Sequence, residues 1–414
     1  MSSSSSLSRD EKALFILILG ALTAFGPLSI DMYLPAFTQI GKDFQVSIAQ
    51  VEWSLAAFFA GLSIGQLFYG PLSDRYGRKR PLIFGMTVYI AASIGCALST
   101  EIEMLVAFRF LQALGGCAGM VISRAMVRDL FNHSESARVF SLLMLVMGLA
   151  PILAPIFGGY LLRVSDWHSI FWLISALAAL CIFAVYNWLP ETHRTETAPR
   201  QTNSVLSTYL SILQDPTFTW NALAGGFAQA GMFAYITGSP FVFMELYGIS
   251  PDHYGWFFGL NAFGLILASQ LNARLLKKRS PDQVLRYSLR VTMLAGLALF
   301  GSSLTSTLMP GGFVQNVGLM GVTAPLFFYI ASLGMVFPNT TAEALAHQGH
   351  RAGAASALIG TLQFVLASLA SLTVSLMHSK SSLPMTSVIA FCGVSAMISQ
   401  SLYRHHGLRS RQTV

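Results

Sequence analysis

The fold is decided by the run from Ala13 to Leu34, ALFILILGALTAFGPLSIDMYL, in which Asp31 is the one charged side chain. About 20 apolar residues in a helix, at about 1.5 Å each, cross the roughly 30 Å hydrocarbon core of a bilayer. The run therefore predicts a membrane-spanning helix. It is too long for the core of a signal peptide, and no small-residue cleavage site follows it, so we expect it to be retained.

Similar runs recur along the whole chain of 414 residues, which is 54% apolar and 10% charged. The low charge excludes an ordinary soluble domain, in which about 25% of residues are charged. Eleven further spans are predicted at residues 48–69, 81–98, 104–122, 139–162, 170–189, 218–236, 254–271, 291–308, 313–336, 352–376 and 385–402. The fold class predicted from these runs is an all-α polytopic membrane protein with twelve transmembrane helices.

The distribution of Lys and Arg predicts the orientation of these spans. With the N-terminus inside, 21 of the 25 basic residues fall in cytoplasmic segments, whereas Lys42, Arg163 and Lys380 fall outside and Arg109 lies within a span. Short cytoplasmic loops collect positive charge in this way. We therefore expect a multi-pass protein of the inner membrane of a bacterium with both termini in the cytoplasm. The net charge of +7 then reflects topology, and no nucleic-acid partner is expected.

The longest polar connection lies between the sixth and seventh predicted spans and indicates a linker between two halves. We expect two six-helix halves around a central cavity, as in many transporters. The expected organisation is a cytoplasmic tail (residues 1–12), an N-terminal half (13–189), a linker (190–216), a C-terminal half (217–403) and a second cytoplasmic tail (404–414).

The short loop between the second and third spans, GPLSDRYGRKR (residues 70–80), is the strongest local motif. Gly70 and Gly77 permit a tight turn, Pro71 is expected to stop the second helix, and the basic residues anchor the loop at the inner leaflet. Asp74 either caps a helix or pairs with an Arg as a latch between conformations; the alternative is a solvated acid in an ordinary basic loop.

This loop resembles the hallmark loop of the major facilitator superfamily. The matching residues are Gly70, Leu72, Asp74, Arg75, Gly77, Arg78 and Lys79. The fourth span, LVAFRFLQALGGCAG, resembles the arginine-bearing motif of the family through Arg109, Gln112, Gly115 and Gly116. The fifth, GLAPILAPIFGG, resembles the motif of export-type antiporters through Gly148, Pro155, Gly158 and Gly159, although Ala154 replaces a glycine and Pro151 is additional.

The first span also resembles that of drug/proton antiporters of the bicyclomycin-resistance type, through PLSIDMYLPAF (residues 27–37). The resemblance covers nearly the whole chain and implies a secondary active transporter that exports small drug-like molecules in exchange for protons by alternating access. A proton-coupled importer or a passive facilitator of a small metabolite remains the alternative. We expect no enzyme activity, no cofactor and no metal, and a monomer whose partners are protons, the substrate and the bilayer.

Two charges inside the predicted spans are candidates for proton coupling, because intramembrane charges are costly and usually functional. Asp31 and Arg109 are each expected near the outer end of a span, where they can pair if the first and fourth helices are neighbours. The alternative for Asp31 is a hydrated outer position, and for Arg109 a purely structural salt bridge. Glu52 and Glu245, at outer ends or loops, are expected to be solvated.

Two further groups of residues are weaker candidates. In the fifth span, the segment from Gly148 to Gly159 provides either a hinge that seals the cavity or a plain packing interface. Polar residues that are candidates for lining the cavity, with interhelical hydrogen bonding as the alternative, are Tyr33, Gln66, Gln112, Tyr235, Asn261 and Gln363.

Overall fold

The structure, a computed structural model, describes residues 8–131, 133–192, 205–308, 312–348, 351–377 and 379–412. Parts of the predicted tails and residues 193–204 of the predicted linker lie outside this description. The described residues form fourteen α-helices and no strands. Two of the helices are short, α2 (Phe37–Asp43) and α8 (Val205–Leu213), so twelve long helices remain. The predicted all-α fold is confirmed.

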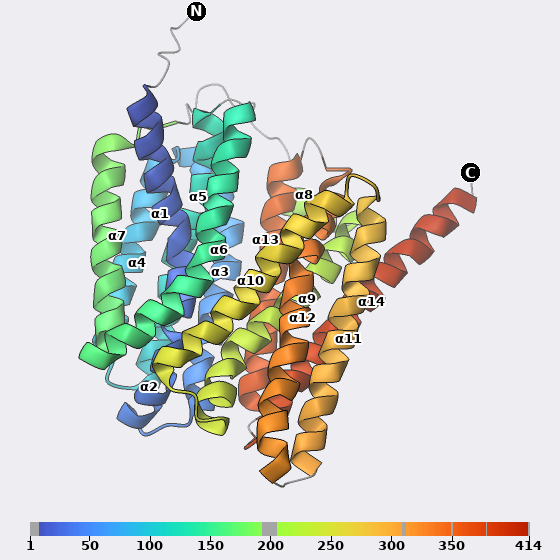
Figure 1. The fold of residues 1–414 in the computed structure, drawn as a ribbon. Helices are drawn as coiled ribbons and strands as arrows, with labels where there is room; N and C mark the ends of the chain where they lie inside the picture. Colours follow the sequence, from blue (N-terminus) through green and yellow to red (C-terminus); the bar gives the residue numbers. More distant parts are fainter. Residues whose placement is uncertain are drawn as a thin grey trace, which may run out of the picture.

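The long helices form two groups of six that follow one another along the chain (Figure 1). The first group is α1 (Arg9–Asp31), α3 (Ile48–Tyr76), α4 (Lys79–Ala97), α5 (Ile102–Leu130), α6 (His133–Val164) and α7 (His168–Trp188). The second group is α9 (Pro216–Ser239), α10 (Pro251–Leu275), α11 (Pro281–Leu308), α12 (Gly312–Leu345), α13 (Ala352–Leu376) and α14 (Leu383–Gln412).

The surface of the bundle is suited to lipid. Large apolar side chains face outward on α7 and α14, among them Leu180, Phe183 and Phe391. By length and hydropathy, nine stretches of the described chain are apolar enough to cross a membrane. The helices α9 and α10 are not among them, and both carry amides, including Asn221 and Asn261. Such polar positions are tolerated in a span when they face other helices rather than lipid.

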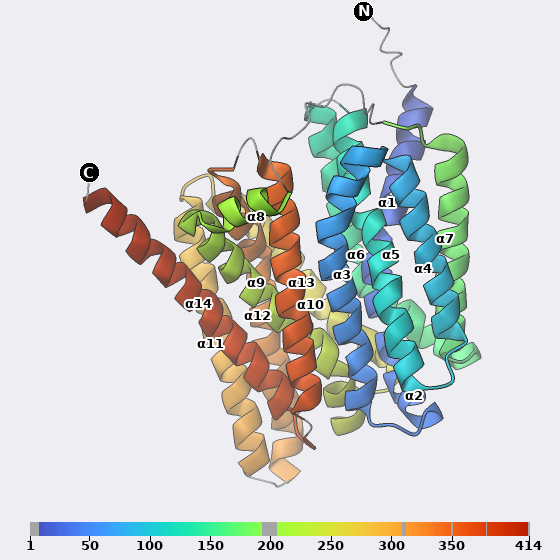
Figure 2. The ribbon, with the colours of Figure 1, turned by 180° about the vertical axis from the view of Figure 1, so that it is seen from behind.

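The two halves meet mainly through α3 packed on α13 and α6 packed on α10. Hydrogen bonds cross the first of these interfaces, from Ser368 to the carbonyl of Ala56 (2.9 Å) and from Ser63 to the carbonyl of Thr361 (3.4 Å). Seen from behind, α3 and α13 lie side by side, and the chain enters and leaves the bundle at the same end (Figure 2). We call this the inner end and the opposite one the outer end.

Two local expectations are corrected by the structure. Pro71 does not stop the second span, because α3 continues through it to Tyr76. A proline near the end of a helix removes one backbone hydrogen bond, and the remaining turns keep the helix intact. The turn itself consists of Gly77 and Arg78 alone. The predicted first span extends to Leu34, whereas α1 ends at Asp31. The chain then forms a 3₁₀ turn, η1 (Leu34–Ala36), and the short helix α2 at the outer end.

Candidate functional site

Asp31 is the last residue of α1 and is buried between the two halves. Its side chain is only 3% exposed, so the hydrated outer position considered above is wrong. Among the described residues, its Oδ1 atom is buried and has no hydrogen-bond partner, and none of the ion pairs includes it. An isolated ionised carboxylate is very costly to bury, so the neutral, protonated acid is the form that fits this position.

Asp31 interacts with polar groups of the other half. The carboxyl lies close enough to the hydroxyls of Tyr235 on α9 and Tyr254 on α10 to interact electrostatically with both. The Tyr235 hydroxyl accepts a hydrogen bond from Asn261 (3.1 Å), and the Tyr254 hydroxyl lies 2.6 Å from that of Ser239. Asp31 therefore lies at the interface between the two halves, opposite α9 and α10.

Arg109 lies on α5 inside the N-terminal half and is completely buried. Its guanidinium stacks over the rings of Phe58 (4.2 Å) and Tyr33 (4.7 Å) and donates to Gln112 (2.6 Å). Its Nε and Nη2 atoms have no hydrogen-bond partner in the described part of the chain. Cation–π contacts stabilise such a charge only partly, so Arg109 remains an incompletely satisfied buried cation.

The structure does not pair Asp31 with Arg109. The guanidinium contacts Tyr33, which lies two residues beyond Asp31 in the turn between α1 and η1. Asp31 interacts with tyrosines of the C-terminal half, whereas Tyr33 and Arg109 lie in the interior of the N-terminal half. The structural salt bridge considered for Arg109 is absent from the described residues.

The six polar residues considered for the cavity separate into two groups. Tyr33 bonds to Ser54 (3.0 Å) and Gln112 bonds to Ser93 (2.7 Å), so both serve the interior of the N-terminal half. Gln66 lies against Gly360 where α3 meets α13, and Gln363 is half-buried on α13. With Tyr235 and Asn261 beside Asp31, these four lie on helices that form the interface between the halves.

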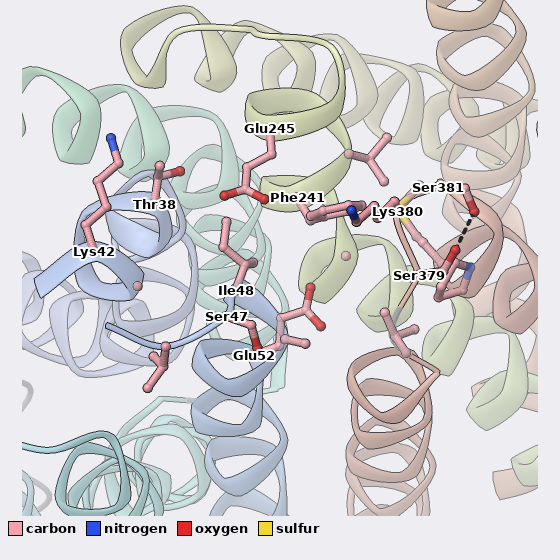
Figure 3. A pocket seen from close by; sticks show the side chains of 18 residues that line it. Thr38, Lys42, Ser47, Ile48, Glu52, Phe241, Glu245, Ser379, Lys380 and Ser381 are labelled. Atoms are coloured by element: carbon pink, nitrogen blue, oxygen red, sulfur yellow. Dashed lines mark hydrogen bonds between the residues drawn. The ribbon is translucent and has the colours of Figure 1, made fainter. Parts of the chain in front are cut away.

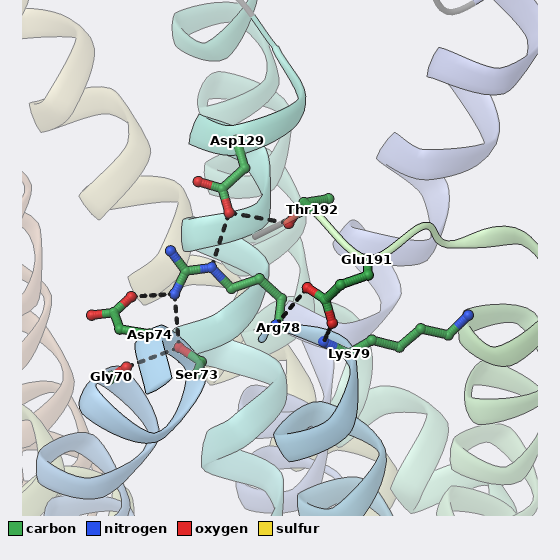
Figure 4. Close-up of polar contacts among 8 residues, drawn as sticks. All are labelled: Gly70, Ser73, Asp74, Arg78, Lys79, Asp129, Glu191 and Thr192. Atoms are coloured by element: carbon green, nitrogen blue, oxygen red, sulfur yellow. Dashed lines mark hydrogen bonds and ion pairs between the residues drawn. The ribbon is translucent and has the colours of Figure 1, made fainter. Parts of the chain in front are cut away.

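The inner loop forms a charge network around Arg78 (Figure 4). Arg78 bonds to Asp74 and Ser73 on α3 and, through Nε, to Asp129 at the end of α5 (2.9 Å). Burial disfavours its charge, but the bonds to Asp129 and Asp74 prevail and raise the pKa of Arg78 above its ordinary value. Asp74 is thus a partner of Arg78, although its side chain remains 65% exposed.

The turn of this loop is held by Glu191, which sequence reasoning did not select. Its carboxylate accepts from the backbone N–H groups of Arg78 (2.7 Å) and Lys79 (3.0 Å), at the start of α4. Gly77 has φ +84°, and a Cβ there would lie 2.7 Å from Glu191. Asp129 and Glu191 lie 51 and 113 residues from Arg78, so only tertiary packing brings them to the motif.

The other loop residues have simpler surroundings. Arg75 stacks over the ring of Tyr76 (5.3 Å) at the inner end of α3. Gly70 lies within α3, and a Cβ there would meet no atom within 4 Å. The structure therefore gives Gly77, and not Gly70, a steric reason to be glycine.

The glycines of the fifth-span motif pack α6 closely on two neighbours. Gly148, Pro151 and Pro155 lie within α6. Gly158 packs on the carbonyl of Met32, just beyond Asp31, and a Cβ on Gly159 would lie 2.6 Å from the carbonyl of Pro251 at the start of α10. The motif therefore contacts both its own half and the opposite one at the outer end, where Arg163 also pairs with Asp252.

A cavity of about 350 Å³ lies between the outer ends of the halves (Figure 3). It is lined by Lys42 from α2, Glu52 from α3, Glu245 from the π-helical turn η2 (Pro240–Leu246) and Lys380 from the connection before α14. The expectation that Glu52 is solvated is wrong, since it is 4% exposed. Glu52 does lie at the outer end of α3, but α13 of the other half packs against α3 and brings Ser375 beside it.

The chain matches known transporters along most of its length. The model of the Major Facilitator Superfamily matches residues 18–371. An uncharacterized MFS-type transporter, YdgK, of Bacillus subtilis is 39% identical over 87% of this chain and 88% of that protein. A bicyclomycin resistance protein homolog of Haemophilus influenzae is 33% identical (96% and 98% covered), and multidrug resistance protein D of Escherichia coli is 29% identical (86% and 87%).

The fold is also shared with solved structures. A bacterial homolog of the human lysosomal transporter Spinster, in an inward-facing and occupied conformation, superposes with a TM-score of 0.68. The alignment covers 98% of both chains at 16% sequence identity, so it supports the fold alone.

Proposed function

Because this chain belongs to the major facilitator superfamily, a family of membrane transporters, we propose that it exports small drug-like molecules from the cytoplasm in exchange for protons. The names of two relatives refer to bicyclomycin resistance and to multidrug resistance, which motivates the substrate class. The observation that best supports this proposal is the position of Asp31, a buried acid at the interface between the halves that forms no ion pair among the described residues.

Alternating access provides the coupling in this proposal. With Asp31 protonated, the interface between α1 and the tyrosines of α9 and α10 holds no net charge and can stay closed. Loss of the proton leaves a carboxylate that requires water, which favours a conformation in which the interface is hydrated. The differential proton affinity of the two conformations is the coupling free energy.

The available energy is sufficient. Each proton that enters releases about 2.3 kcal/mol per 100 mV of membrane potential and about 1.4 kcal/mol per pH unit. A tenfold gradient of a neutral substrate costs about 1.4 kcal/mol. One proton per molecule therefore supports export against a gradient.

The test is proton release driven by the drug. In inside-out vesicles with an acidic interior, adding bicyclomycin or a lipophilic cation such as ethidium should collapse the pH gradient, followed with a pH-sensitive dye. We expect the wild type to respond and Asp31→Asn to lose the response. Asp10→Asn, which alters an exposed carboxylate at the start of the same helix, should behave as the wild type.

Two outcomes contradict the proposal. If Asp31→Asn releases protons as the wild type does, the coupling site lies elsewhere. If neither protein releases protons while the drug still equilibrates across the membrane, the chain is a passive facilitator.

A further inference from the structure

Glu52 is a second buried acid at the interface between the halves, about one turn into α3 at the outer end. It is 4% exposed, and no ion pair among the described residues joins it to a Lys or Arg. Figure 3 shows its carboxyl directed into the space between the halves. As for Asp31, the neutral acid is the form that fits such a position.

The carboxyl of Glu52 lies where the two halves meet. It is near the hydroxyl of Ser375 on α13, and α13 packs on α3 along this interface. The hydroxyl of Ser375 donates to the carbonyl of Ser371 (3.0 Å) within its own helix. A neutral acid can remain enclosed between the two helices, whereas a carboxylate requires water and favours their separation.

The charged groups that face Glu52 do not replace this proton. Glu245 on η2 interacts with it electrostatically, and this like charge disfavours the ionised form. Lys42 on α2 and Lys380 before α14 line the same cavity, and both are exposed. Neither forms an ion pair with Glu52 within the described residues. The exposed lysines lie where the cavity meets the outer surface, which gives protons a route from the outer medium.

We propose that Glu52 is a second proton-binding site, filled from the outer medium, whose protonation holds the outer ends of the two halves together. The closed form binds this proton more tightly than an open form in which Glu52 is hydrated. By linkage, a low outer pH stabilises closure, and raising the pH favours opening. The inference rests on the proposed exchange of protons for drug, because it assigns to Glu52 the outer gate and leaves coupling to Asp31.

The experiment measures the separation of the outer ends without any drug. Spin labels are attached to cysteines introduced at Glu101 and Leu308, which are exposed at the outer ends of opposite halves. The four native cysteines are buried and are left in place. Distances are recorded by pulsed electron paramagnetic resonance in lipid nanodiscs from about pH 6 to about pH 9, a range that brackets a carboxylic acid stabilised by burial.

We expect the population with a longer distance to grow as the pH rises in the wild type. Glu52→Gln has nearly the same shape as the acid and carries no charge, so it should stay in the short-distance form at every pH. Glu103→Gln, an exposed acid at the outer end that does not line the cavity, should respond as the wild type does.

The results separate this inference from the proposed function. A transition that persists in Asp31→Asn and is lost in Glu52→Gln supports the second site. The inference is overturned if Glu52→Gln still opens with pH, if the wild type shows no transition, or if Asp31→Asn alone abolishes it. Since no drug is present, these results are independent of drug-driven proton release by the wild type.

Discussion

At the scale of single residues, the decisive contrast is between two buried ionisable side chains with different environments. Asp31 interacts with the hydroxyls of Tyr235 and Tyr254 in the opposite half, whereas Arg109 is enclosed by aromatic rings of its own half. Neither neutralises the other. A buried cation without a carboxylate partner is not expected to stabilise the fold, because replacing buried charges with apolar side chains is often neutral or stabilising. We therefore expect Arg109 to serve transport.

Arg109→Met tests this interpretation. Methionine fills a similar volume among the rings and amide, so the protein should fold and unfold at close to the wild-type temperature. Transport should fall by at least about tenfold, equivalent to about 1.4 kcal/mol of lost transition-state stabilisation. Thermal unfolding in detergent and drug-driven proton release measure the two effects. If Arg109→Met lowers the amount of folded protein and the transport rate by the same factor, Arg109 has only a structural role.

Gly77 carries a second prediction at this scale. Its φ of +84° and ψ of 168° belong to a region that is essentially restricted to glycine, where another residue costs about 1–3 kcal/mol. Gly77→Ala should lower the unfolding temperature, because it also displaces the carboxylate of Glu191 from the start of α4. The matched change Gly70→Ala, which meets open space within a helix, should leave the temperature unchanged or raise it slightly.

The account of Gly77 would be contradicted if the two alanine variants unfolded at the same temperature. It would also be contradicted if Gly77→Ala lowered the temperature equally in wild-type and Glu191→Ala backgrounds, since the clash with the carboxylate would then play no part.

At the scale of elements, α6 connects the candidate coupling residue to the interface with α10. Gly158 packs on the carbonyl next to Asp31, and Gly159 packs on the first residue of α10. These contacts require small side chains, and larger ones separate the helices. The glycines of the export-type motif therefore allow close packing at the outer end, which is where a transporter loaded from the cytoplasm must be sealed.

Gly159→Val should weaken this seal without unfolding the helix. The added side chain clashes with the carbonyl of Pro251, so we expect the spin-label distance between positions 101 and 308 to increase at constant pH. Gly301→Val on α11, where a Cβ meets no atom within 4 Å, provides the matched control and should leave the distance unchanged. An unchanged distance in Gly159→Val would mean that the motif is a packing interface without influence on closure.

Much of the element scale was predictable from sequence, because apolar runs and basic loops follow directly from the properties of the bilayer. The spans, the two halves and the turn at Gly77 were found in this way. The partners of Arg78 were not, since Asp129 and Glu191 are distant in sequence and carry no local pattern. The burial of Glu52 was missed because hydropathy reports depth along a helix and says nothing about which face a neighbour covers.

At the scale of the whole molecule, the two halves carry different parts of the proposed mechanism. The N-terminal half contains both candidate proton sites and the inner charge network, whereas the C-terminal half contributes hydroxyls and amides such as Tyr235, Asn261 and Ser375. Protonation of one half thus changes how well the other half fits against it. This asymmetry could not be read from sequence, because Tyr235 and Asn261 resemble ordinary interhelical hydrogen-bonding residues until Asp31 is placed beside them.

The most direct test of this account is uphill transport in liposomes that contain only this protein. With an acidic interior and the protein oriented inside-out, an imposed pH gradient should drive radiolabelled bicyclomycin into the lumen above its external concentration. Asp31→Asn should still exchange labelled for unlabelled drug at equal concentrations but should not accumulate it. Accumulation by Asp31→Asn equal to that of the wild type would contradict the assignment of proton coupling to Asp31.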